Sequence, residues 1–99
     1  MSFVDGYRQV LDAMPADIRE AHRHSSKHRD ELMASALCGC FYCCETFRPE
    51  EICEWTDLDA NGVAQTAMCP LCGIDSVLGS ESGYELSAEF LGRMRRYWF

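Results

Sequence analysis

Two cysteine motifs decide the fold of this chain: Cys40-Phe41-Tyr42-Cys43 and Cys69-Pro70-Leu71-Cys72-Gly73. Two residues between paired cysteines allow a tight turn whose thiolates converge on one ion, and the glycine after the second pair permits the positive φ of such a turn. Two such turns supply four soft ligands in a tetrahedron, the arrangement of closed structural zinc sites. The sequence therefore predicts a zinc site, with iron in a rubredoxin-like site as the alternative. Its ligands are Cys40, Cys43, Cys69 and Cys72.

The cysteine content favours metal over disulfides. The chain has seven cysteines, an odd number, and Cys43 and Cys44 are adjacent, which fits poorly with a set of disulfides. Residues 1–8 lack a basic start followed by a long apolar run, so we expect no export signal and a cytoplasmic location. Thiols stay reduced there. No apolar run approaches the roughly 18 residues of a membrane-spanning helix.

The other three cysteines have separate expectations. Cys38 stands two residues before Cys40 and is the alternative ligand in its place. Cys44 directly follows a ligand, so its side chain is expected to point away from the ion. Cys53 lies in a strand-like run and is expected to be a small buried hydrophobic residue.

The sequence around the motifs predicts one α+β domain, with its metal-binding part at 38–79. Strand-prone runs at 51–56 and 63–68 flank a turn-rich segment, which indicates a β-hairpin. A cysteine turn, a hairpin and a second cysteine turn occur in this order in treble-clef and zinc-ribbon modules. A treble clef would continue into a helix at 74–78, where this sequence has room for only a turn or two, so both modules stay open.

Helical patterns precede this part, over residues 1–37. Apolar spacing predicts a first helix over 3–14 and a second that begins at Pro15 and continues, whole or broken in two, to Leu37. If the second is broken, Ser26 is the expected N-cap of its later half.

Residues 80–99 predict a turn and a C-terminal helix. Ser87 is the expected N-cap, with Leu86 and Leu91 as a hydrophobic staple. An apolar stripe is expected to pack on the metal-bearing hairpin, and it consists of Phe90, Leu91, Met94 and Trp98. The aromatic end 97–99 is expected to pack in the core, with a binding handle as the alternative.

Three histidines form a second candidate cluster. His24 and His28 are four residues apart and would share a helix face, as two ligands of one ion do. No third ligand stands at a recognisable spacing, so the simpler interpretation places both, with His22, on a solvated polar face. The stretch His22–Arg29 is a local basic patch and a candidate docking surface.

The formal net charge of -7 bears on the class of partner. It opposes binding to duplex DNA, because nonspecific affinity depends on Lys and Arg neutralising phosphates. A nucleic-acid-binding zinc finger is the second function considered. It needs a local positive face, which would have to come from Arg93, Arg95, Arg96 and the His22–Arg29 stretch. A closed tetrathiolate site has no position for a water, which opposes a zinc enzyme. The favoured function is a zinc-stabilised module that binds another protein, and a rubredoxin-like electron carrier is the least favoured.

Four strings of this sequence occur together: Cys38-Gly39-Cys40-Phe41-Tyr42-Cys43, Ile52-x-x-Trp55-x-Asp57, Cys69-Pro70-Leu71-Cys72-Gly73-Ile74-Asp75-Ser76-Val77 and Tyr97-Trp98-Phe99. In this combination the chain resembles, over residues 22–99, a group of short bacterial cytoplasmic proteins of uncharacterised function. The resemblance implies a bacterial, cytoplasmic origin and supports the same four ligands. It implies no activity.

Overall fold

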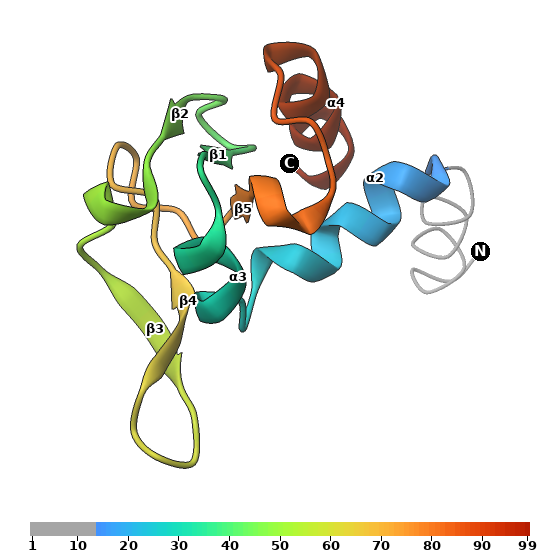
Figure 1. The fold of residues 1–99 in the computed structure, drawn as a ribbon. Coiled ribbons are helices and arrows are strands. Elements are labelled where there is room, and N and C mark those ends of the chain that lie inside the picture. The colour runs from blue at the N-terminus through green and yellow to red at the C-terminus, as the bar shows by residue number, and fades with distance from the viewer. Residues whose placement is uncertain (1–13) are drawn as a thin grey trace.

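The computed structural model describes residues 14–99, and its architecture is α+β, as predicted (Figure 1). The α-helices are α2 (Ala16–Ala21), α3 (Arg29–Ala34) and α4 (Ala88–Trp98). The strands are β1 (Cys38–Cys40), β2 (Thr46–Phe47), β3 (Trp55–Leu58), β4 (Ala64–Ala67) and β5 (Val77–Gly79). Short 3-10 helices cover His22–Ser25, Pro49–Glu51 and Ser80–Ser82. The helix expected over 3–14 lies, apart from its last residue, outside the described part.

A three-stranded antiparallel sheet of order β2-β1-β5 separates two hydrophobic cores. Side chains alternate between the faces of a strand. The cysteine core lies on one face and comprises Leu32, Cys38, Cys40, Phe47, Ile52, Ala67, Cys69 and Val77. The helix core lies on the other and comprises Met14, Ile18, Ala21, Phe41, Leu78, Leu86, Phe90, Leu91 and Met94. The two cores therefore share β1 and β5 as a common wall.

Helix α4 begins as the sequence predicts but packs elsewhere. The Phe90 N–H donates to the Ser87 hydroxyl at 3.1 Å, and Leu86 and Leu91 are both buried in the helix core. Its apolar stripe contacts α2 and one face of the sheet, where Leu91 lies close to Gly39. The expectation that the stripe packs on the hairpin is wrong, because α2 and the sheet offer a wide apolar surface and the hairpin projects away from α4 (Figure 1).

The predicted hairpin is present as β3 and β4, with Trp55 opposite Ala67 and Leu58 opposite Ala64. Its first strand begins at Trp55, later than expected, and the 3-10 helix Pro49–Glu51 occupies the start of the expected run. At the tip, an Asp59 carboxylate oxygen accepts hydrogen bonds from the N–H groups of two later residues in the loop, at 2.9 and 3.0 Å. The turn chemistry of this segment thus closes the hairpin.

The N-terminal helical region is broken in two, but not at the expected cap. The N–H of Lys27 donates to the Thr66 hydroxyl and that of His28 to the Gln65 carbonyl, both at 2.8 Å. These bonds hold the chain against β4, so α3 begins only at Arg29, with His28 and not Ser26 at the N-cap. The helix also ends before Leu37, at Ala34. Within residues 14–99, no helix combines the length and the apolar character needed to cross a membrane.

Candidate metal centre

The structure brings the four predicted cysteines together at one end of the sheet. Cys40 ends β1 and Cys43 lies in the turn to β2, whereas Cys69 and Cys72 lie in the turn between β4 and β5. Their four Sγ atoms all lie within 4.8 Å of one another. Cysteines far apart in sequence approach one another here, at 3.7 Å for Cys40 to Cys72 and 3.8 Å for Cys43 to Cys69.

These distances fit a metal ion. A tetrahedral ion bonded to sulfur at about 2.3 Å places its ligands about 3.8 Å apart, close to both measured pairs. Disulfide sulfurs would be only about 2.05 Å apart, and the seven cysteines are all free thiols. The four-cysteine group can therefore hold a metal ion, and its soft donors suit zinc or iron.

The two cysteine turns, here called the first knuckle (40–44) and the second knuckle (69–73), have the same backbone. In the first, the Cys44 N–H donates to the Cys40 carbonyl at 2.8 Å, and in the second, the Gly73 N–H donates to the Cys69 carbonyl at 2.9 Å. The last residue has a positive φ in both, 62° at Cys44 and 80° at Gly73. Sequence reasoning found this conformation only where glycine marks it.

Each knuckle also directs an N–H group at its first sulfur. The Tyr42 N–H lies 3.4 Å from the Cys40 Sγ, and the Leu71 N–H lies 3.4 Å from the Cys69 Sγ. Such bonds stabilise a thiolate over a thiol. Both knuckles thus place a backbone donor beside their first sulfur.

Ser76 adds a contact that the sequence did not reveal. Its buried hydroxyl lies 3.1 Å from the Cys40 Sγ. Burial alone raises the pKa of Cys40, but bonds from Ser76 and from backbone N–H groups more than offset this and lower the pKa below its ordinary value. Desolvation raises the pKa of Cys43 to about 12, and also raises that of Cys72. Metal binding must therefore displace protons from this group.

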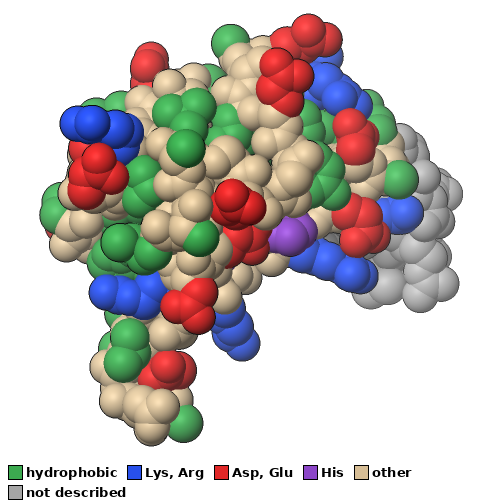
Figure 2. Space-filling model, in the orientation of Figure 1, with side chains coloured by type: hydrophobic (Ala, Val, Ile, Leu, Met, Phe, Trp, Pro, Cys, Tyr) green, Lys and Arg blue, Asp and Glu red, His purple; other side chains and the backbone are tan. Residues whose placement is uncertain are grey.

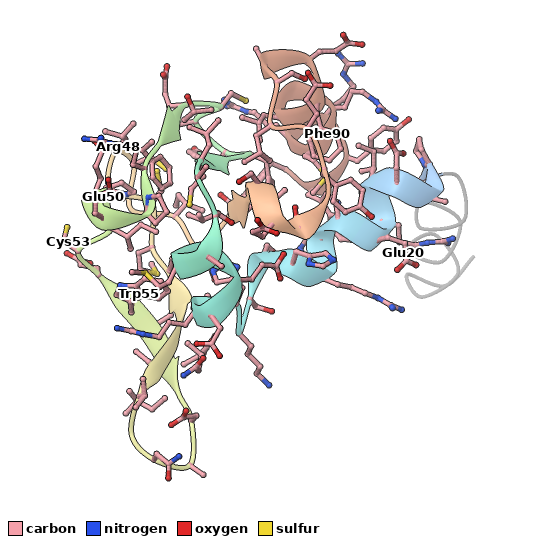
Figure 3. The ribbon with its side chains drawn as sticks, in the orientation of Figure 1. Glu20, Arg48, Glu50, Cys53, Trp55 and Phe90 are labelled. Atoms are coloured by element: carbon pink, nitrogen blue, oxygen red, sulfur yellow. The ribbon has the colours of Figure 1, made fainter. Side chains whose placement is uncertain are left out.

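The other cysteines are outside the group. Cys38 is fully buried in the cysteine core, where burial raises its pKa to about 12, so it is a neutral core thiol and does not replace Cys40. Cys44 packs against the helix core, away from the four sulfurs. Cys53 is exposed at the outer edge of the molecule (Figure 3), so the prediction of burial is wrong. Its neighbour Ile52 takes the inward position in this extended segment.

The three histidines are held separately, and the four-cysteine group is the only cluster of metal-ligating side chains found over residues 14–99. His22 stacks on the Trp98 ring, and His24 contacts the Glu31 carboxylate at 2.8 Å. His28 is only 4% exposed, so the interpretation as a solvated face is wrong for this residue. Its Nδ1–H donates to the His24 carbonyl, and its Nε2 accepts from the Ala67 N–H at 3.1 Å. The imidazole thus joins the helical region to β4.

The basic side chains of the predicted nucleic-acid face are largely engaged within the chain. Arg93 pairs with Asp17 at 3.0 Å, Arg95 donates to the Tyr42 carbonyl at 2.8 Å, and Arg29 lies over the Trp55 ring. Figure 2 shows basic and acidic side chains interspersed over the visible face. The described residues therefore present no continuous basic surface on this face.

The second knuckle leads into a strand. A treble clef would have a helix at 74–78, but β5 begins at Val77 and pairs with β1, with Cys40 opposite Val77. The first knuckle thus joins two paired strands, β1 and β2, whereas the second joins β4 and β5, which belong to different sheets. The chain matches no protein-family model, and neither curated proteins nor solved structures give a match.

Proposed function

We propose that the four cysteines bind one zinc ion with a structural role, and that the protein is a small metal-stabilised module that binds another protein. The observation that carries the proposal is the group of four sulfurs within 4.8 Å of one another, with two pairs at the spacing of a tetrahedral thiolate site. Four thiolates complete the coordination of zinc and leave no position for a water or a substrate. This complete coordination supports a structural role for the ion and opposes a catalytic one.

The position of the site supports a structural role. The first knuckle follows β1, and the second knuckle precedes β5. These two strands form the wall between the cores. Phe41, inside the first knuckle, is itself 2% exposed and packs in the helix core. An ion held by both knuckles would therefore fix strands on which both cores depend.

A protein is the partner that the surface supports best. The net charge of -7 and the internal pairing of Arg93 and Arg95 oppose a polyanion. Large apolar side chains are exposed on the second knuckle, the hairpin and α4, and these contribute contact area in protein interfaces. They are Leu71, Leu58, Val63, Tyr97 and Phe99.

Metal analysis of the purified protein tests the ion. We expect one zinc per chain, and replacement by cobalt should give the absorption bands of a tetrahedral thiolate site. Cys53→Ser should leave the metal content and the bands unchanged, whereas Cys72→Ser should bind zinc more weakly and change the cobalt bands. A red preparation with one iron per chain would overturn the choice of zinc, and no bound metal at all would overturn the site.

Two binding experiments test the partner class. Duplex DNA should show no mobility shift with the protein even at low salt, where phosphate contacts are strongest. Capture from a nuclease-treated bacterial lysate should retain a specific protein, and Leu71→Glu, which places a charge on an exposed apolar position, should reduce its recovery. A DNA shift that weakens with salt would instead support the nucleic-acid-binding alternative.

A further inference from the structure

A small pocket lies beside the metal centre. Its volume is about 160 Å³, and its walls come from the 3-10 helix after α2, the first knuckle, the segment before β5 and the end of α4. The side chains that matter here are His22, Phe41, Asp75, Ser76, Trp98 and Phe99.

Aromatic rings belong to half of the residues that line this pocket. His22 stacks on Trp98 with ring centres 3.8 Å apart, and Phe41 lies 6.1 Å from His22 and 5.8 Å from Phe99. The Trp98 indole N–H donates to the Ile18 carbonyl at 3.3 Å, which fixes the ring against α2. His22 covers one face of Trp98, and Phe41 is only 2% exposed. The half-buried Trp98 and the exposed Phe99 therefore supply the aromatic surface here, and such surfaces attract cations.

The formal charge at the pocket is negative. Asp75 is exposed at the rim of the pocket. The next residue, Ser76, lies in the pocket wall and contacts the Cys40 sulfur. Burial lowers the pKa of His22, and the Asp75 carboxylate offsets this only in part, so the imidazole is neutral at pH 7. An anion would meet no positive side chain among these lining residues, whereas a cation would meet a carboxylate and aromatic rings.

The size limits the ligand further. Sites for drug-sized ligands and cofactors usually measure about 300–1,000 Å³. A cavity of about 160 Å³ admits a compact group only. We propose that this pocket binds an alkylated ammonium group, carried either by a small free molecule or by a methylated lysine of a partner protein. None of the four clustered cysteines lines this pocket, although Ser76 is shared between the pocket and the metal centre.

Trp98 fluorescence provides the readout. The chain has two tryptophans, so Trp55→Phe leaves Trp98 as the single reporter and keeps an aromatic ring under Arg29. Choline and 3,3-dimethylbutan-1-ol form a matched pair of probes, because they have the same shape and only choline is charged. We expect choline to change the emission saturably and to bind about 2- to 30-fold more tightly than the alcohol, the range that cation–π attraction supplies.

Variants locate the site. Asp75→Asn should weaken choline binding about 2- to 10-fold, as expected for loss of a partly exposed opposite charge. Asp30→Asn removes another exposed carboxylate, on α3 and outside this pocket, and should leave binding unchanged. Circular dichroism spectra that match the parent would show that both variants fold.

Three outcomes would overturn the proposal: no saturable response to choline, equal affinity for the neutral alcohol, or equal weakening by both Asp variants. A further comparison distinguishes the two sources of the cation and supports the proposal in either direction. Tighter binding of trimethyllysine amide than of choline would indicate a partner's side chain, and the reverse order would indicate a free small molecule.

Discussion

Replacing Cys72 by serine should remove a large part of the stability of this domain. The Cys72 Sγ lies 3.7 Å from that of Cys40, at tetrahedral spacing, and is partly exposed, so the serine hydroxyl fits without strain. What changes is the donor, because a hydroxyl is a much poorer zinc ligand than a thiolate. The effect on stability therefore measures metal binding more than packing.

The magnitude follows from the share of one ligand. Structural zinc contributes about 10–16 kcal/mol to folding at pH 7, or about 2.5–4 kcal/mol for each of four ligands if they share it equally. Small domains have total stabilities of about 5–15 kcal/mol, so this loss is a large fraction. For a domain of this size it corresponds to a fall in Tm of about 10–30 °C.

Cys53→Ser is the matched control, since it makes the same chemical change at an exposed cysteine outside the group. We expect it to shift stability by less than about 0.5 kcal/mol. The assay is thermal unfolding followed by circular dichroism, together with zinc per chain for both variants. If Cys72→Ser has the same Tm as Cys53→Ser and retains one zinc per chain, the four sulfurs do not jointly bind an ion that stabilises the fold.

Three further predictions concern the surroundings of the site. Ser76→Ala should lower zinc affinity about 10- to 100-fold in a competition with a chelator, because the metal ligand Cys40 loses its contact with the hydroxyl. Unchanged affinity would show that this hydroxyl does not contribute to metal binding. Gly73→Ala should destabilise the protein by about 1–2 kcal/mol in urea unfolding, because φ is 80° at this position. Gly92→Ala, in open space on α4, should instead stabilise the protein by about 0.5–1 kcal/mol. Equal effects of the two substitutions would contradict the role of φ. Burial lowers the pKa of His28 below 6.5, so the folded state binds fewer protons than the unfolded state and the free energy of unfolding should fall as the pH drops below 6.5. His28→Gln should be less stable than the parent at pH 7.5 but should lose less stability between pH 7.5 and 5.5. Identical losses in the variant and the parent would contradict this assignment.

Local chemistry made much of this molecule predictable. The hairpin, the N-cap at Ser87 and the positive φ at Gly73 each depend on a few neighbouring residues, and the structure contains all three. The convergence of the four cysteines was predictable for a similar reason, because hydrogen bonds within each knuckle set its backbone.

What the sequence did not reveal depends on contacts between distant segments. Strands β1, β2 and β5 contain only two or three residues each, too few to show a periodic pattern. His28 is buried because it accepts a hydrogen bond from Ala67, 39 residues away, and Cys44 adopts a positive φ without glycine because it belongs to a knuckle. The apolar stripe of α4 was visible, but its partner was set by tertiary packing.

The projecting hairpin has a practical consequence. Its tip, at Asn61 and Gly62, lies between the two knuckles in sequence, so a cut there would give two fragments that each carry one knuckle and one strand of the β1–β5 pair. Neither fragment holds more than two of the four sulfurs. Mixed in solution, the halves should therefore associate when zinc is added and separate when it is withdrawn, which would make this small fold a metal-controlled split reporter.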